Sequence, residues 1–288
     1  AHTATAMSES PTAQPFREDA ILKRAVDVSI AQLRTFCRHY RHAGDPEGFS
    51  KEQVSTVEQR RLEFSGPDEG GMVWLNGVFD AEGGAVIRTA LEPLARRDGT
   101  LDGRCRDRRL ADALVELAGH ALDSGSLPDR ASQRAHLQIT APVETVLGLP
   151  GSPAADMEFA LPISGDSVRR ISCDCNVTRI LLGPESAVVD VGRSRRVVSG
   201  STRRALNVRD GGCRWPGCDR QASWTAAHHV VHWSQGGPTD LSNLVLLCYR
   251  HHFLVHEGGW QLIRTDQGEV LTVPPRVEID PFARGPAD

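Results

Sequence analysis

The chain has 288 residues, of which 40% are hydrophobic and 24% are charged, and its formal net charge is −4 at pH 7. These values are ordinary for a folded globular protein, and they exclude a protein that binds nucleic acid through bulk positive charge. No apolar run approaches the ~18 residues that a membrane helix needs. The seven cysteines are odd in number and cluster near histidines. They therefore favour metal binding in a reducing cytoplasm over a disulfide framework, with no membrane partner.

The first part of the chain has two predicted features. Residues 1–15 are rich in Ala, Ser, Thr and Pro, which predicts a disordered N-terminus. Apolar residues then recur at helical spacing over 22–37 and predict one amphipathic helix. Further along, the pair Asn76-Gly77 predicts a tight hairpin turn, because these residues tolerate the positive φ angles of such turns.

Helices dominate the predictions for the middle of the chain. Asp80 is placed to cap a helix that runs to Leu94, and a further helix is expected over 110–122. Residues 136–141 alternate in polarity and predict a strand, and a helix near Ser167 leads toward a second strand. The region 16–191 is therefore expected to be mixed but mostly helical.

A small C-terminal domain is predicted over 192–270, followed by a Pro-rich tail over 271–288. Its first element is a short helix that Ser201 could cap and that ends at Gly211. From Gly192 to Leu262 there are nine arginines, no lysine and four acidic residues, so this segment is positive against an acidic remainder. Such a split in charge predicts an anionic partner for the C-terminal domain.

Four residues of this domain have the spacing of a structural zinc site. Their pattern is Cys-x4-Cys followed by Cys-x2-His, at Cys213, Cys218, Cys248 and His251. Thiolates and imidazole are the ligands that zinc prefers in tetrahedral sites. The alternative is that these are free core cysteines. Cys173 and Cys175 could compete as ligands, but they are one residue apart on an extended segment and would face opposite sides, so we interpret them as structural.

A second group is rich in histidine, which indicates either metal ligands or a compositional accident on a polar surface. Its members are His228, His229, Asn243, His252 and His256. His252 and His256 are four residues apart, so a helix would place them on one face. A strand with the His-His pair, a loop, a second strand and this helix would form a ββα unit with one metal ion between the first strand and the helix.

This arrangement of His-His, Asn and His-x3-His, threaded through the paired Cys pattern, resembles the HNH (ββα-metal) endonuclease motif. The segments CDCNVTRILLG and VGRSRRVVSGSTRRALNVRDGGCRWPGC resemble the 13E12-repeat family. Those proteins join a helical domain of unknown function 222 (DUF222) to a C-terminal HNH domain. The resemblance covers about 18–264 and implies an α+β fold: a mostly helical N-terminal region, then a small zinc-stapled ββα-metal domain.

The resemblance also implies roles for individual residues. His229 would be the general base that takes a proton from water, and Asn243 would orient it through a hydrogen bond. His228, His252 and His256 would hold one catalytic divalent ion, in addition to the structural Zn²⁺. Many relatives have Asp where His228 stands, and three imidazoles favour Mn²⁺, Ni²⁺, Co²⁺ or Zn²⁺ over Mg²⁺.

Two adjacent strand residues, His228 and His229, would have to reach one phosphate, so a bulge or a strand end is expected there. His232 is interpreted as a surface or supporting residue. The expected partner is double-stranded DNA, and a homodimer is possible. Four arginines could contact its phosphates, although each is more often simply solvated: Arg203, Arg204, Arg209 and Arg250.

The resemblance leads us to expect an endonuclease that hydrolyses DNA phosphodiester bonds. The alternative is a catalytically inactive, zinc-stapled DNA-binding module. The intact His229 and Asn243 argue against that alternative, because simple binding requires neither.

Overall fold

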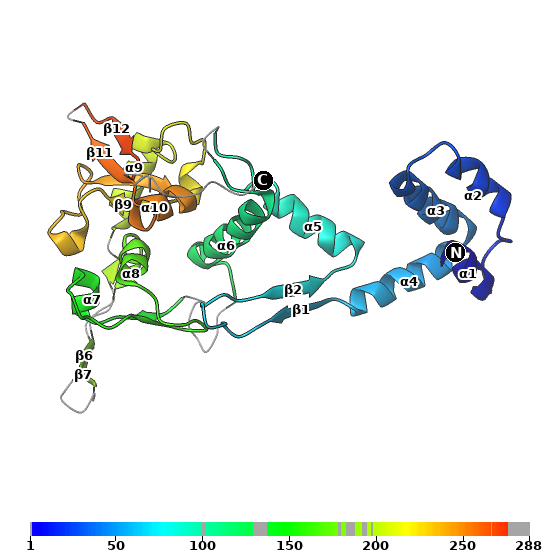
Figure 1. Cartoon of the computed structure of the whole chain (residues 1–288), viewed down its shortest axis with the longest axis horizontal. Helices are drawn as coiled ribbons and strands as arrows, with labels where there is room; N and C mark the ends of the chain where they lie inside the picture. Colours follow the sequence, from blue (N-terminus) through cyan, green and yellow to red (C-terminus); the bar gives the residue numbers. More distant parts are fainter. Residues whose placement is uncertain are drawn as a thin grey trace, which may run out of the picture. The chain divides into compact units, whose positions relative to one another are not determined.

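The structure is a computed structural model that describes residues 2–99, 102–128, 137–177, 180–182, 188–191, 195–196, 198–265 and 267–275. The chain divides into two compact units, coloured along the sequence in Figure 1. The first unit comprises Ala1–Ser65 and Val73–Ala90, and the second comprises Gly66–Met72 and Leu91–Asp288. The second unit therefore continues across the predicted domain boundary at 191–192. None of the described helices is long and apolar enough to cross a membrane.

The first unit is mainly helical. Its elements in chain order are α1 (His2–Glu9), α2 (Glu18–Ala25), α3 (Ile30–Gly44), α4 (Pro46–Glu58), β1 (Arg61–Phe64), β2 (Leu75–Val78) and α5 (Ala81–Leu91). The prediction of a disordered N-terminus is wrong for α1, whose Met7 is buried. The prediction of one helix over 22–37 is also wrong. Ser29 interrupts the helical pattern because its side chain forms a capping box with Gln32 and so begins α3.

The predicted hairpin turn at Asn76-Gly77 is wrong as well. Both residues lie inside β2, where Gly77 pairs with Leu62 and Asn76 pairs with Glu63 of the antiparallel β1. The chain turns between Phe64 and Leu75 instead, so cross-strand pairing overrides the local turn preference. The predicted cap is confirmed: the Asp80 carboxylate accepts hydrogen bonds from the main-chain N–H groups of residues 82 and 83 at 3.2 and 3.3 Å.

The second unit begins with a helical part and ends with small antiparallel sheets. Its described elements are α6 (Arg106–Ser124), β3 (Ile139–Thr140), α7 (Val143–Leu147), β4 (Asp156–Met157), α8 (Gly165–Ser172), β5 (Asn176–Val177), β6 (Ile180–Leu182), β7 (Val188–Val191), β8 (Arg195–Arg196), α9 (Gly200–Asp210), β9 (Thr225–His229), β10 (Leu244–Cys248), α10 (Tyr249–His256), β11 (Gln261–Arg264) and β12 (Val270–Val273). The helices predicted over 110–122, near Ser167 and before Gly211 are confirmed, and the fold is α+β.

Three details differ from the sequence predictions. The cap of α9 is Ser199 rather than Ser201, since the Ser199 hydroxyl accepts from the main-chain N–H of Thr202 at 3.2 Å. The predicted tail begins inside β12, which pairs with β11, and its residues 276–288 lie outside the described residues. Likewise, α5 ends at Leu91 rather than Leu94.

The predicted ββα unit is present and forms the centre of the second unit. β9 and β10 are antiparallel, and α10 begins directly after the last residue of β10. All five residues of β10 are buried, because both faces of this two-stranded sheet are covered. Leu244 and Leu246 pack with Leu206 of α9 on one face, and Val245 and Leu247 pack toward Val255 of α10 and Val270 of β12 on the other.

Candidate functional site

One face of the ββα unit brings three predicted ligands together. The His228 ring from β9 and the rings of His252 and His256 from α10 form a triangle, with centroid distances of 5.1 Å (His228–His252), 4.9 Å (His228–His256) and 4.9 Å (His252–His256). Nδ1 of His228 and Nε2 of His256 are 3.1 Å apart. His252 Nε2 is buried and has no hydrogen-bond partner among the described residues. An unpaired buried nitrogen is costly, so this atom fits a metal ligand better than a packing residue.

The three imidazoles are neutral at physiological pH. Burial lowers the pKa of His228 and of His252 well below the ordinary value, and neighbouring histidines add to the effect. Burial also lowers the pKa of His256 to about 3, with His232 contributing. Neutral imidazole is the form that binds a metal, so protons do not compete with a cation for these nitrogens near pH 7.

A fourth potential ligand, Cys173, comes from the turn after α8. Its Sγ lies 3.4 Å from His256 Nε2 and 4.0 Å from His228 Nδ1. The ligand atoms of these four residues all lie within 4.8 Å of one another. We call Cys173, His228, His252 and His256 the His3Cys cluster. The sequence prediction missed Cys173 because its contact with the histidines spans 55 residues of chain or more, and spacing reports only local geometry.

His229 does not belong to this cluster. The register of β9 and β10 is regular, with His228 opposite Val245 and His229 opposite Leu244, so there is no bulge. The two histidines therefore point to opposite faces of the sheet. The other predicted alternative, a strand end, is present because β9 ends at His229. His229 Nε2 lies 2.9 Å from the Thr239 hydroxyl, while its Nδ1 is buried without a partner among the described residues. Burial lowers the pKa of His229, which favours the neutral form.

Asn243 fixes the loop beside His229 rather than the imidazole itself. Its side-chain amide donates to the carbonyls of Val231 and Pro238, both at 2.8 Å, and its oxygen accepts from the N–H of Val231 at 2.9 Å. The expected hydrogen bond from Asn243 to the His229 ring is therefore wrong, since the amide is fully engaged with backbone. The main-chain carbonyl of Asn243 also accepts from Val230 N–H, directly after His229.

His232 is a buried supporting residue, and not a surface residue. Its Nδ1 lies 2.7 Å from the Ser234 hydroxyl and its Nε2 lies 3.2 Å from the main-chain carbonyl of Arg169 in α8. Burial lowers the pKa of His232 to about 4. Its ring contacts the rings of both His229 and His256, with centroid distances of 6.1 and 5.9 Å. It therefore packs against the predicted general base and against one of the predicted metal ligands.

The four residues of the predicted zinc site also converge, and we call them the Cys3His cluster: Cys213, Cys218, Cys248 and His251. Nδ1 of His251 lies 3.4 Å from Cys213 Sγ and 3.3 Å from Cys248 Sγ. The Trp215 ring stacks on the His251 ring at 4.4 Å, with an interplanar angle of 3°. Three thiols and one imidazole are a donor set suited to zinc, so these residues could hold a structural ion.

The other nitrogen of His251 is held by a carboxylate that no local sequence pattern marks. His251 Nε2 lies 3.0 Å from Asp98, which precedes α6. Burial alone would lower the pKa of His251, but hydrogen bonds with Asp98 and with the cluster thiols raise it to about 10. Such a carboxylate fixes the ring so that Nδ1 faces the metal position.

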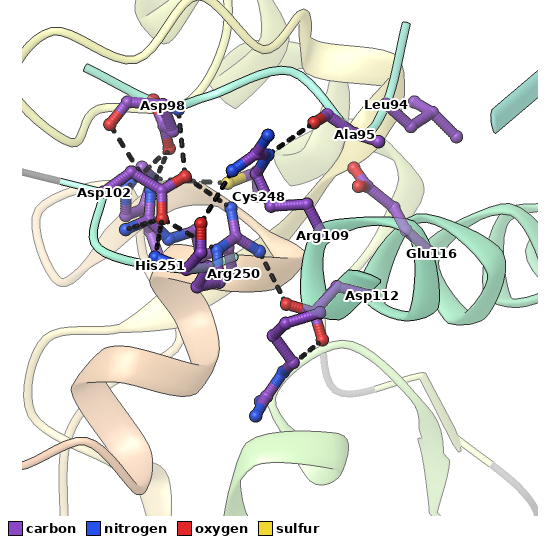
Figure 2. A network of polar contacts seen from close by, with 12 residues as sticks. Leu94, Ala95, Asp98, Asp102, Arg109, Asp112, Glu116, Cys248, Arg250 and His251 are labelled. Atoms are coloured by element: carbon purple, nitrogen blue, oxygen red, sulfur yellow. Dashed lines mark hydrogen bonds and ion pairs between the residues drawn. The ribbon is translucent and has the colours of Figure 1, made fainter. Parts of the chain in front are cut away.

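Asp98 belongs to a larger polar network, shown in Figure 2. Arg250 of α10 pairs with Asp98 at 3.0 Å and with the buried Asp102 at 3.3 Å. Arg104 pairs with Asp102 at 2.9 Å and with Asp112 of α6 at 2.6 Å. The network links α10, which carries His251, His252 and His256, to the segment that precedes α6.

Two protein-family models together match most of the chain. The model described as "Domain of unknown function (DUF222)" matches residues 8–210, and the model described as "HNH endonuclease" matches residues 212–257. The chain belongs to the DUF222 family. Its HNH domain holds every histidine of the His3Cys cluster and the whole Cys3His cluster, whereas Cys173 and Asp98 belong to the DUF222 part. An HNH domain points to a nuclease-like or DNA-binding function.

Several mycobacterial proteins are similar to the chain. "Uncharacterized protein Rv1128c" of Mycobacterium tuberculosis is 25% identical over 90% of this chain and 60% of its own length. "Uncharacterized protein Rv1702cMb1728c" of the same species is 27% identical over 73% of this chain and 49% of its own length. "Uncharacterized protein Mb1179c" of Mycobacterium bovis is 25% identical over 89% of this chain and 62% of its own length. The chain thus spans roughly half to three-fifths of the relatives it matches. No solved structure matches it significantly.

The arginines expected at DNA mostly hold partners within the chain. Arg203 pairs with Asp174 at 2.8 Å, Arg209 pairs with Asp210 at 2.7 Å, and Arg250 belongs to the network around Asp98. Arg204 is exposed and makes no ion pair with any described residue. Of the four, Arg204 is therefore the one whose charge is not already neutralised by a described carboxylate.

Proposed function

We propose that the chain is a metal-dependent endonuclease that hydrolyses phosphodiester bonds of double-stranded DNA. The main support for the proposal is that three neutral imidazoles lie close together in a segment that matches the HNH endonuclease model. They belong to His228, His252 and His256. The buried, unpartnered Nε2 of His252 supports a cation at this position. A module that only binds DNA through charge would have no need of such a cluster.

His228, His252 and His256 would hold one divalent ion. Bound there, the ion would supply positive charge to neutralise the scissile phosphate and the leaving oxygen. Imidazole nitrogens favour Zn²⁺, Mn²⁺, Co²⁺ or Ni²⁺ over Mg²⁺, which prefers oxygen ligands. The Cys3His cluster would hold a separate structural zinc ion and take no part in the chemistry.

His229 would accept a proton from the attacking water. If Nε2–H donates to the Thr239 hydroxyl, 2.9 Å away, Nδ1 carries the lone pair that a base requires. The lowered pKa of His229, caused by burial, keeps the ring in the neutral form that can take up a proton. Asn243 would act as a positioning residue, since its amide holds the loop that follows His229.

Arg204 would contact a DNA phosphate. Its exposure and its lack of an ion-pair partner among the described residues support this role, and such a contact would add affinity without reading sequence. Arg203, Arg209 and Arg250 would contribute mainly by holding the HNH domain together.

The test is nicking of supercoiled plasmid with Mn²⁺, Co²⁺, Ni²⁺, Zn²⁺ or Mg²⁺. We expect the wild type to cut, and His229→Ala to cut about 10²–10⁴-fold more slowly because the general base is lost. The same variant should bind DNA normally in a gel-shift assay without metal, and His39→Ala, at an exposed histidine of α3, should cut like the wild type. DNA binding by a wild type that cuts with none of these ions would favour the inactive binding module. Equal cutting by His229→Ala and wild type would remove His229 from the mechanism.

A further inference from the structure

Cys173 lies where a fourth metal ligand would lie. With Zn–S bonds of about 2.3 Å and Zn–N bonds of about 2.0 Å, the ligands of a tetrahedral ion are separated by about 3.3–3.6 Å. The cluster shows 3.1 Å between His228 Nδ1 and His256 Nε2, and 3.4 and 4.0 Å from Cys173 Sγ to those two nitrogens. The sulfur is therefore within the expected ligand-to-ligand distance of His256 Nε2 and slightly beyond it from His228 Nδ1, and the ligand atoms of all four residues lie within 4.8 Å of one another.

Hydrogen bonds within the His3Cys cluster do not satisfy all of its potential ligand atoms. His252 Nε2 has no hydrogen-bond partner among the described residues, although it is surrounded by three groups that can donate or accept. The Cys173 side chain is fully buried, and burial raises the pKa of its thiol to about 12. The thiol is therefore neutral in the absence of a cation, and a bound divalent ion would balance the charge that the sulfur acquires when it loses its proton.

The segment that carries Cys173 is fastened to the HNH domain on both sides of the cysteine. Before it, Arg170 pairs with Glu257 at 2.5 Å, Ser167 donates to Glu257 at 2.9 Å, and the Arg169 carbonyl meets His232. After it, the Asp174 carboxylate accepts from Arg203 at 2.8 Å and from the N–H of Ala227 in β9 at 3.1 Å. These contacts fix the position of the sulfur independently of the cluster itself. Figure 1 shows α8 beside α10.

We propose that Cys173 is the fourth protein ligand of the ion held by His228, His252 and His256, so that the DUF222 part closes the metal centre of the HNH domain. The inference rests on the metal site of the proposed function. It assigns a thiolate-containing donor set, which suits Zn²⁺, Co²⁺ or Ni²⁺ and disfavours Mg²⁺.

The number of protein ligands decides whether substrate can reach the ion. A tetrahedral ion with four protein ligands has no position for substrate, whereas a catalytic site keeps one open. On binding the ion, the Cys173 thiol would release one proton to solvent. If α8 withdrew, the sulfur would leave the ion and take a proton back, and one coordination position would become free. Access to DNA would therefore require movement of the segment from Gly165 to Asp174.

The first experiment identifies the ligand by its spectrum. The full-length protein is loaded with one equivalent of Zn²⁺, whose retention is checked by elemental analysis, and Co²⁺ is then titrated in. We expect the first equivalent of Co²⁺ to produce thiolate-to-cobalt charge-transfer absorption together with tetrahedral d–d bands. Cys173→Ser should lose the charge-transfer absorption while still binding Co²⁺ through its histidines. Cys175→Ser, a matched cysteine two residues away, should keep the wild-type spectrum.

The outcomes separate this inference from the proposed function. Binding of Co²⁺ without a thiolate band in the wild type, or with the same band in Cys173→Ser, would overturn the role of Cys173 and leave the histidine site intact. If no Co²⁺ bound beyond the zinc, the metal site of the proposed nuclease would itself be refuted.

The second experiment tests closure. If the closed form holds nine-tenths of the molecules, opening the centre increases activity roughly 10-fold. We expect Cys173→Ser to nick plasmid faster than the wild type by about this factor, with Cys175→Ser unchanged. Arg170→Gln removes the ion pair with Glu257 but keeps the sulfur, and it should also nick plasmid faster than the wild type. Rates equal to or below that of the wild type in both Cys173→Ser and Arg170→Gln, with unchanged thermal melting, would refute closure.

Discussion

The Cys3His and His3Cys clusters lie on one ββα unit but are held in different ways. All four residues of the Cys3His cluster come from the HNH domain, and Asp98 holds the second nitrogen of its histidine. The His3Cys cluster takes three residues from the HNH domain and one from the DUF222 part, and one of its nitrogens has no partner among the described residues. The Cys3His cluster is therefore suited to holding the fold together, and the His3Cys cluster is suited to chemistry.

The two clusters are joined by consecutive residues of α10. His251 belongs to the Cys3His cluster and His252 to the His3Cys cluster. Consecutive positions of a helix point about 100° apart, so one short helix can present one imidazole to each cluster. Any rotation of α10 would disturb both clusters, which is why the network of Arg250 with Asp98 and Asp102 matters for each.

The largest difference between the clusters should appear on loss of a ligand. Cys248→Ser removes a thiol of the Cys3His cluster, and we expect loss of the tightly held zinc and unfolding of the ββα unit, because structural zinc contributes about 10 kcal/mol or more to such small domains. Zinc content and circular dichroism during thermal melting check this. His252→Ala should lose only the exchangeable ion and keep its structure. Equal unfolding of the two variants would contradict the division of roles.

Asp102→Asn should weaken the contact between the DUF222 part and α10. Burial alone would raise the pKa of Asp102, but hydrogen bonds from Arg104 and from the main chain of Asp98 lower it well below its ordinary value. The stability that this carboxylate provides is therefore present above about pH 4 and is lost as the pH falls below it. We expect the variant to lose about 2 kcal/mol of unfolding free energy at pH 7, because Arg104 and Arg250 each lose one of their two carboxylate partners.

The measurement for Asp102→Asn is urea unfolding at several pH values. The difference from the wild type should shrink as the pH falls below about 4, since the Asp102 carboxyl of the unfolded wild type then takes up a proton while that of the folded protein stays ionised. A difference that stayed constant down to about pH 2 would show that Asp102 acts through its shape and not through its charge.

Asp98→Asn should affect only one of the two clusters. Removing the carboxylate that holds His251 Nε2 should lower the zinc affinity of the Cys3His cluster about 10–100-fold, as is usual for such supporting groups. Competition with a chromophoric chelator measures this affinity. Cobalt binding by the His3Cys cluster serves as the internal control, and an equal loss of affinity there would show that the two clusters respond as one.

The smallest expected effect concerns Thr239. Thr239→Val removes the hydroxyl 2.9 Å from His229 Nε2 but keeps the shape of the side chain. We expect nicking to slow by roughly 10-fold, the equivalent of one hydrogen bond that fixes the tautomer, with metal content and DNA affinity unchanged. Thr225→Val is a control threonine in the same domain. Unchanged nicking by Thr239→Val would mean that the tautomer of His229 is set by another group.

Much of the candidate site could be predicted from local spacing. The Cys-x4-Cys and Cys-x2-His pairs and the His-x3-His pair each lie within one turn or one helix, so their geometry follows from short stretches of chain. The partners from the DUF222 part could not be found in this way. Cys173 reaches His228 and Asp98 reaches His251 across long stretches of sequence, and nothing in their immediate neighbours marks them.

The wrong predictions share a physical cause. Asn76-Gly77 has the composition of a turn but is held in β2 by its pairing with β1. Asn243 has the chemistry to orient an imidazole, yet its amide is fully used by the backbone of the neighbouring loop. In both places a tertiary contact decides between conformations that the local sequence leaves equally available. The helix start at Asp80 and the helix end at Gly211 were predicted correctly, because each depends on a few adjacent residues, whereas the start of α9 and the end of α5 were not.

The intramolecular pairing of Arg203, Arg209 and Arg250 has a consequence for how DNA affinity responds to ionic strength. Each phosphate neutralised by a protein cation releases counterions and contributes about −0.9 to the slope of log affinity against log salt concentration. Nine arginines between Gly192 and Leu262 would suggest a steep dependence. Carboxylates of the chain already neutralise at least four of them, because Arg220 also pairs with Glu116. Fewer counterions would therefore be displaced on association with DNA, and such a complex should tolerate salt better than the composition of the basic segment implies.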